Sequence, residues 1–297
     1  MSQQHLPTAV RTGDWLARVV PKALVVLLAL AVILGGVWTY YDVKWGRELS
    51  RELEAWKAQG LPLSMSEVIP KPVPDSENAA PLYLSVFNVS FEPAIRPSPR
   101  RNFADLSDEE EDLIDDHRRG KERAGSAAQV RAILSRPEVV QALQTLKRAS
   151  QYPNAVFPVK WELGFAAVFP HMPRFLDATR MVTVQALVLA EDGQMADAFD
   201  WCLVGLRMAD HTAMEPSMIA QLVAMAMRNM ALGTIEELIS ARSVPAAAGQ
   251  ALQEHLQGID VYGFYDQAMR LEGAFGRSTF AQLREKPEIL AETVRDV

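Results

Sequence analysis

Residues 21–42 read PKALVVLLALAVILGGVWTYYD, and the organisation of the whole chain follows from them. Residues 23–41 carry no charge, between Lys22 on one side and Asp42 on the other. At a rise of 1.5 Å per residue, a helix of this length spans about 28 Å, close to the hydrocarbon thickness of a bilayer. A cleaved signal peptide has a shorter apolar run and a small-residue cleavage site, and a buried core helix rarely stays uncharged for so long. We therefore predict a transmembrane helix over residues 23–41.

Two groups of residues within this helix suggest how it sits in the bilayer. The rings of Trp38, Tyr40 and Tyr41 lie at one end, where amphipathic aromatic side chains prefer the headgroup zone, so they are candidate interfacial anchors. Ala31 and Gly35 form a small-xxx-small pair, which lets two helices approach closely. This pair is therefore a candidate contact with another membrane helix.

The orientation depends on the flanking charges. Lys and Arg residues are nearly balanced on the two sides of the span, so the positive-inside rule alone does not decide. A short basic N-terminus ahead of an uncleaved anchor usually stays in the cytoplasm. We therefore expect a single-pass protein of the cell membrane, with a short cytoplasmic tail (residues 1–22) and an extracytoplasmic C-terminal domain.

Two further segments separate the span from that domain. Residues 42–59 are predicted to form a juxtamembrane helix, which Gly60 and Pro62 end. Its apolar residues recur at helical spacing and form a candidate contact stripe, made of Trp45, Leu49, Leu53 and Trp56. Residues 60–103 contain eight prolines, which exclude a long helix, so we expect an extended, Pro-rich connector there. Within it, residues 76–87 (SENAAPLYLSVF) are expected to form a short helix capped by Asp75 or Ser76.

The remainder, residues 104–297, is predicted to be a domain of antiparallel helical hairpins. Glycines and prolines divide it into helical stretches, and no stretch shows the sustained alternation of a half-buried strand. The fold class is therefore all-α, with one transmembrane helix ahead of a soluble helical domain. The main helices are expected at residues 173–192, 195–214, 216–241, 246–257 and 260–284.

The helix pair around Gly193 resembles one tetratricopeptide (TPR) hairpin. Ala186, Leu189, Gly193, Ala198 and Gly205 fall at the small or apolar positions where the two helices of such a repeat touch. Cys202 stands where the repeat usually has an aromatic residue, and Asp210 where it closes with proline. The likeness covers one repeat length, and residues 124–243 are also similar in style to uncharacterised membrane-anchored helical proteins of environmental bacteria. The resemblance implies a binding scaffold, because the concave faces of TPR-like stacks hold peptides or partner proteins.

Composition excludes several classes of function. Lys plus Arg number 30 against 37 Asp plus Glu, a net charge of −7, so no nucleic-acid partner is expected. With a single cysteine, Cys202, the chain forms neither an internal disulfide nor a zinc site built on several thiolates. The common catalytic motifs are absent and the five histidines lack ligand spacing, so we predict no cofactor, no metal and no enzymatic activity.

Methionine is the one compositional oddity, with nine of 12 between residues 172 and 230. Its usual role is to fill irregular gaps between helices. The sharper hypothesis is a soft groove for an apolar ligand, with Met208, Met214, Met218 and Met225 as candidate lining residues.

Three hypotheses of function follow. The leading one is a non-enzymatic protein, bound to the lipid bilayer, that serves as a scaffold or accessory subunit and binds a partner protein or a second copy of itself. The second is a membrane-tethered binder of a lipid or other apolar ligand in the methionine-lined groove. The third is an enzyme with an unrecognised site, for which the candidate carboxylates are Glu162, Asp177 and Glu191.

Overall fold

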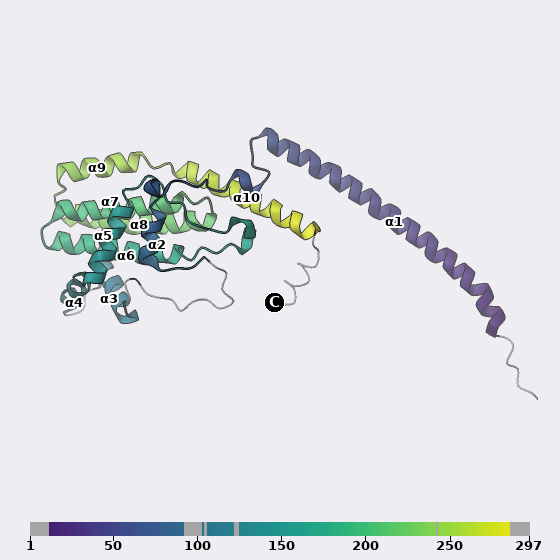
Figure 1. Ribbon diagram of the computed structural model, residues 1–297, viewed down its shortest axis with the longest axis horizontal. Helices are drawn as coiled ribbons and strands as arrows, with labels where there is room; N and C mark the ends of the chain where they lie inside the picture. The colour runs from purple at the N-terminus through teal and green to yellow at the C-terminus, as the bar shows by residue number, and fades with distance from the viewer. Residues whose placement is uncertain (1–11, 92–102, 104–105, 122–124, 242, 286–297) are drawn as a thin grey trace, which may run out of the picture. The chain divides into compact units, whose positions relative to one another are not determined.

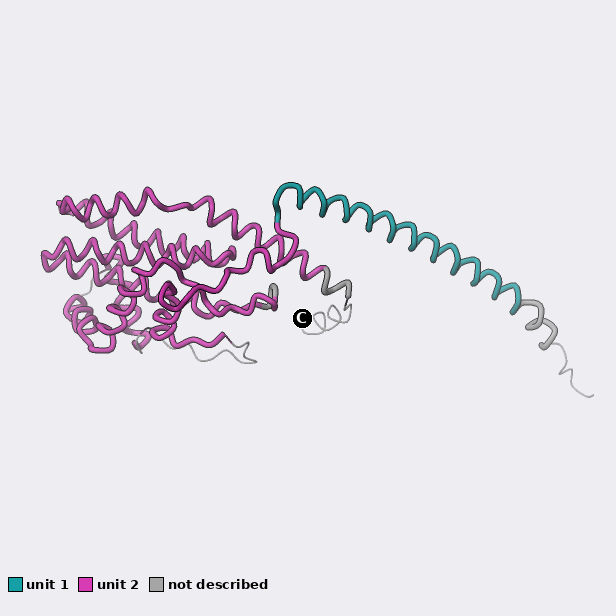
Figure 2. The backbone as a smooth tube through the Cα atoms, turned by 45° about the horizontal axis from the view of Figure 1, so that its top comes forward, with its two compact units in different colours: residues 1–61 teal, residues 62–297 magenta. Residues whose placement is uncertain are grey.

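The computed structural model describes residues 12–91, 103, 106–121, 125–241 and 243–285 (Figure 1). Every regular element in these ranges is a helix, and the only extended pairing in them is an isolated bridge between Asn78 and Asn154. The all-α prediction is therefore confirmed. The chain divides into two compact units, Met1–Leu61 and Pro62–Val297 (Figure 2).

The first unit is one long helix, α1 (Thr12–Ala58). The predicted transmembrane and juxtamembrane helices are thus continuous, and the helix begins inside the predicted tail, of which residues 1–11 lie outside the described ranges. The end of α1 is a Schellman motif. Gly60 has a φ of +70° and donates to the Lys57 carbonyl, while the Leu61 amide donates to the Trp56 carbonyl. Glycine adopts this left-handed conformation without the steric cost of a Cβ, which is why the helix ends here.

Two helices within the described residues are long and apolar enough to cross a membrane. The most apolar 18-residue window of the Val20–Ala58 part of α1 has a mean hydropathy of 2.4, and none of this window is buried. The other helix is α8 (Met218–Ala241), with a mean hydropathy of 1.3 and 39% of its window buried. The apolar residues of α8 therefore serve in part as core, whereas the most apolar window of α1 is fully exposed.

The second unit is built around α6 (Met172–Glu191), α7 (Met195–Ala213) and α8, which pack against one another along their lengths (Figure 1). Gly193, with a φ of +82°, makes the tight turn between α6 and α7. A Cβ built on Gly205 would lie 3.4 Å from the Ala231 Cβ and 3.6 Å from Val182 Cγ1. Gly205 therefore lets the backbone of α7 approach both neighbouring helices.

Further helices surround this centre, most of them shorter and one, α10 (Val261–Glu285), slightly longer than the central three. They are α2 (Ala80–Phe87), α3 (Asp108–Arg118), α4 (Ser126–Leu134), α5 (Pro137–Ala149), α9 (Ala246–Gln257) and α10 (Val261–Glu285), with single 3₁₀ turns η1 (Met65–Glu67) and η2 (Asp75–Glu77) and the longer η4 (Trp161–Ala166). The five main helices lie within two residues of their predicted bounds. The largest shift is at α8, where Ser217 accepts a hydrogen bond from the Ala220 amide and acts as the N-cap in place of Pro216.

The predicted Pro-rich connector contains the short helix expected within it. Its prolines exclude a long helix, but the eight-residue α2 lies within it and sends Ala80, Tyr83 and Phe87 into the core. Asn78 fixes the start of this helix, because its side chain donates to the Val156 carbonyl and accepts from the Val156 and Ala80 amides. Part of the predicted connector is therefore a structural element of the second unit.

Candidate functional site

Six aromatic side chains gather at one end of the α6–α7–α8 centre. Phe175 lies edge-on to Tyr83 and to Phe87, with ring centroids 4.8 and 4.9 Å apart, and His171 stacks on Phe157 at 4.2 Å. The sixth ring, His211, stands edge-on to Tyr83 at 5.7 Å. All six are buried. We call Tyr83, Phe87, Phe157, His171, Phe175 and His211 the aromatic–histidine cluster.

One histidine of the cluster is fully hydrogen-bonded. Nε2 of His211 lies 2.8 Å from the Tyr152 carbonyl oxygen, which can only accept, so Nε2 carries the proton. In the neutral ring Nδ1 is then an acceptor, and the Tyr83 hydroxyl donates to it at 2.8 Å. Burial lowers the pKa of His211 and raises that of Tyr83 well above its usual value, so both groups are neutral. This chain of hydrogen bonds ties α7 to α2.

The neutral His211 makes a pH dependence of stability predictable. The unfolded chain takes up a proton near pH 6.5, while the folded chain resists it because its His211 pKa is lower. Stability from this group is therefore complete above about pH 6.5 and decreases as the pH falls, by at most about 1.4 kcal/mol per unit. We expect His211→Gln to remove this part of the slope when urea unfolding is measured between about pH 7 and 5.5. Identical slopes for the two proteins would contradict the assignment.

The second histidine of the cluster pairs with a carboxylate. His171, at the N-cap of α6, is fully buried, and its Nε2 lies 2.9 Å from Glu215 Oε2 in the turn between α7 and α8. Glu215 is itself only 4% exposed. The side-chain amide of Gln221 donates to the carbonyl oxygens of Ala213 and Glu215, at 2.8 and 3.3 Å, and holds this turn in place.

A cavity of about 180 Å³ adjoins this pair. Glu215 lines it, with Phe157, Trp161 and Met214 as the large apolar side chains and Lys71 on the exposed connector. An apolar groove of about 410 Å³ shares Phe157 and Trp161 with this cavity and continues along the start of α2. The two hollows combine aromatic walls with one buried acid, a lining typical of small-molecule sites.

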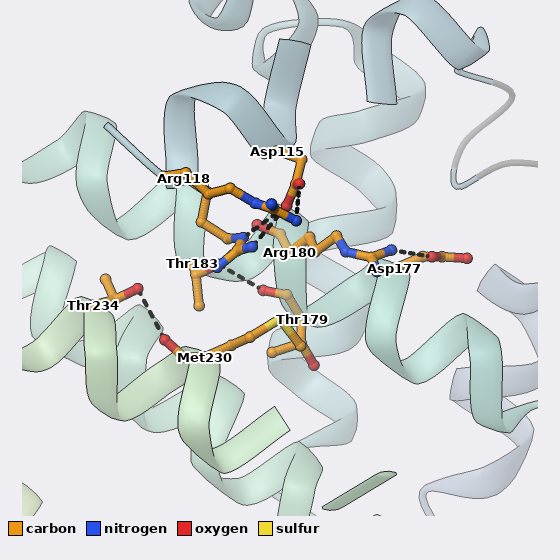
Figure 3. Close-up of polar contacts among 9 residues, drawn as sticks. Asp115, Arg118, Asp177, Thr179, Arg180, Thr183, Met230 and Thr234 are labelled. Atoms are coloured by element: carbon orange, nitrogen blue, oxygen red, sulfur yellow. Dashed lines mark hydrogen bonds and ion pairs between the residues drawn. The ribbon is translucent and has the colours of Figure 1, made fainter. Parts of the chain in front are cut away.

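A second polar cluster joins α3 to α6 (Figure 3). Arg118 donates to Asp115 Oδ1 at 2.7 Å, and Arg180 donates to Asp177 Oδ1 at 2.7 Å. Burial would raise the pKa of Asp115, but the hydrogen bond from Arg118 and the nearby arginine charges hold it below its ordinary value. Both carboxylates line a cavity of about 230 Å³, yet each is already paired with arginine. The cluster has the character of a structural ion-pair network.

The candidate catalytic carboxylates do not come together. Asp177 and Glu191 lie fourteen positions apart on α6, a separation of about 21 Å. Glu191 forms a salt bridge with Arg131 instead, and Glu162 is exposed on η4. Paired glycosidase-type carboxylates lie within about 10 Å of each other. Burial also raises the pKa of Cys202 to about 12, which leaves its thiol protonated.

The candidate contact residues of α1 are exposed, apart from two in the juxtamembrane stripe. The residues around Ala31 and Gly35 are exposed, and a Cβ on Gly35 would meet nothing within 4 Å. The three candidate anchors, Trp38, Tyr40 and Tyr41, are exposed. In the juxtamembrane stripe, Trp45 and Leu49 are exposed, while Leu53 and Trp56 are half-buried.

The candidate hairpin residues lie where α6 and α7 meet. Ala186 and Ala198 are fully buried and Leu189 is half-buried, while Gly193 and Gly205 occupy the turn and the close approach described above. Asp210 stands where the TPR pattern has proline, and it has a different role here. Asp210 forms ion pairs with Arg228 of α8 and His255 of α9, at 2.9 and 3.0 Å, and so connects three helices.

The four candidate methionines do not share one groove. Met208 is fully buried in the core, Met214 lines the cavity beside Glu215, and Met218 is half-buried at the start of α8. Met225 is exposed on the outer side of α8. The spacing of the methionines in the sequence does not distinguish core positions from surface positions, because Met is compatible with both.

The aromatic–histidine cluster and Glu215 escaped the sequence analysis, because their members come from residues 83–215 and no local motif joins them. Two signals were present, namely the aromatic segment around Phe157 and the acid next to Pro216. Comparisons with known proteins identify no relative of this chain. No protein family, curated protein or solved structure matches the chain.

Proposed function

We propose that this chain is a single-pass membrane protein whose Pro62–Val297 unit binds another protein, as a scaffold or accessory subunit of a membrane complex. The α1 helix is the anchor, with its N-terminus in the cytoplasm and the second unit outside. The support for the anchor is the exposed, uncharged stretch of α1, which water solvates poorly. The role is one of binding and not of catalysis.

The observation that carries the binding role is an exposed apolar surface on α8 and α10. Ile219, Leu222 and Met225 follow one another at intervals of three residues along α8, and Leu222 is 60% exposed. On α10, Tyr262 is 89% exposed, and further exposed side chains follow it at helical spacing. We call Ile219, Leu222, Met225, Tyr262, Tyr265 and Met269 the α8–α10 surface.

Two contacts indicate that the exposed residues of α8 and those of α10 lie along the boundary between the two helices. The Met218 amide donates to Glu272, and the Arg228 guanidinium lies over the Phe264 ring, so α8 and α10 are antiparallel. Leu222 comes four residues after Met218, and Met225 three before Arg228. On α10, Tyr265 and Met269 come seven and three residues before Glu272, and so lie on the same side of that helix. Contiguous apolar surface of this kind is typical of interaction sites.

The hairpin architecture supports a scaffold. The α6–α7 pair has small residues at its crossing and a glycine at its turn, which resembles a TPR hairpin, and α8 packs against both helices. In such stacks a rigid centre holds an outer face in one shape. Here the fully buried Ala186, Ala198 and Ala231 supply the close packing that keeps α8 in place.

Site-specific photocrosslinking in native membranes tests this proposal. A benzoylphenylalanine at Leu222 or at Tyr265 is expected to give the same protein adduct, while the matched control at Val140, exposed on α5, gives none. Adding Met225→Glu to the Tyr265 variant should reduce the adduct about tenfold, because a buried carboxylate opposes binding. An adduct with a second copy would identify a homo-oligomer. Adducts with lipid alone, or yields no higher than at Val140, would refute the binding role.

A further inference from the structure

The His171–Glu215 pair leaves one carboxylate oxygen unused. Oε2 of Glu215 lies against His171 Nε2, but Oε1 is buried and has no hydrogen-bond partner among the described residues. A buried carboxylate oxygen without a donor is costly, and native proteins rarely leave one unpaired. The unpaired Oε1 therefore indicates that a hydrogen-bond donor binds beside it.

Space for a ligand lies beside this acid. The cavity that Glu215 lines has a volume of about 180 Å³, several times the share of about 30 Å³ that a water molecule takes in the liquid. Its large apolar wall residues are Phe157, Trp161 and Met214, and it shares Phe157 and Trp161 with the apolar groove along α2. Lys71 lines the cavity too, but it forms no ion pair with Glu215 in the described structure.

We propose that this cavity binds a small primary amine with an apolar or aromatic body. The protonated amino group donates to Glu215 Oε1, where the carboxylate and the faces of Phe157 and Trp161 stabilise a cation. The body of the ligand fills the groove between Trp161 and the start of α2. A carboxylate ligand of the same shape is repelled at the Glu215 end. This site is independent of the α8–α10 surface and of any protein partner.

Calorimetry on the full-length protein in lipid nanodiscs tests the site with two probes of one shape, 2-phenylethylamine and 3-phenylpropionate. We expect saturable binding of the amine only. Glu215→Gln keeps the shape of the side chain and removes its charge, so it should weaken amine binding about tenfold or more. The control Glu162→Gln, exposed on η4 and outside the cavity, should leave the affinity unchanged.

A second variant covers the case in which Glu215→Gln does not fold. Val156→Trp fills the cavity from its half-buried wall and leaves both residues of the His171–Glu215 pair unchanged in type, and it should abolish amine binding. Equal binding of 3-phenylpropionate, unchanged amine affinity in Val156→Trp, or no saturable amine binding up to the solubility limit would each overturn the proposal. In the last case water alone occupies the cavity.

Discussion

Replacing Leu30 and Leu34 together by arginine is expected to release the protein from the membrane. Both residues are exposed on α1, near the middle of the uncharged stretch 23–41, and four positions apart they share one side of the helix. An arginine at the centre of a transmembrane helix costs about 2.5–3.5 kcal/mol, so the pair costs about 5–7 kcal/mol. That cost corresponds to a change of about four to five powers of ten in partitioning.

The same helix supplies the matched control. Leu49 and Leu53 have the same spacing and lie beyond Asp42, where charged residues already alternate with apolar ones. Leu49→Arg with Leu53→Arg is expected to leave the protein in the carbonate-resistant membrane fraction, while the Leu30 and Leu34 pair moves it to the soluble fraction. If the Leu30 and Leu34 double variant still floats with liposomes like the wild type, α1 is not the anchor.

The two most apolar helices show why composition alone does not assign a role. In both, mean hydropathy passes the level needed to cross a membrane. One side of α8, with Ala224, Met227 and Ile235, is buried against neighbouring helices, while Leu222 and Met225 are exposed. In α1 the side chains from Leu24 to Tyr41 contact no other element of the first unit, which is a single helix. The difference is one of packing, and packing depends on the rest of the fold.

Local signals predicted the helices well. Gly193 and Gly60 end helices because their positive φ angles suit glycine, and these turns were placed from the residue type alone. The α2 helix was predicted within the Pro-rich connector, but its cap was expected at Asp75 or Ser76, whereas the helix begins at Ala80. Proline is compatible with the first turn of a helix, and Pro81 sits in the first turn of α2. The hydrogen bonds from Asn78 that fix this helix reach across to Val156, far away in sequence.

The candidate site was not predictable in the same way. Tyr83 and His211 are 128 positions apart, and His171 and Glu215 are 44 apart, so only the packing of α2, α6 and α7 brings them together. A lone histidine in a sequence is compatible with an exposed position, a core position or a ligand. The burial that decides between these roles comes from the aromatic rings around it, and these rings are contributed by four separate segments.

The His171–Glu215 pair is expected to be one of the most sensitive positions of the second unit. His171→Phe preserves stacking on Phe157 but removes the only hydrogen-bond partner of the Glu215 carboxylate among the described residues. Breaking a buried ion pair by removing one partner costs about 3–5 kcal/mol, because the remaining charge stays buried. Urea unfolding of the full-length protein should show this loss as a lower midpoint with little change in slope.

The double variant separates this explanation from a simple loss of packing. Adding Glu215→Leu to His171→Phe removes the stranded carboxylate, so most of the lost stability should return, since apolar replacements of a buried pair are often neutral. His255→Phe is the control, because its partner Asp210 retains Arg228, and the loss should stay below about 1 kcal/mol. If the double variant is no more stable than His171→Phe alone, the Glu215 carboxylate is not the source of the cost. The pair would then be a packing contact, and Glu215 Oε1 would carry no charge to attract an amine ligand.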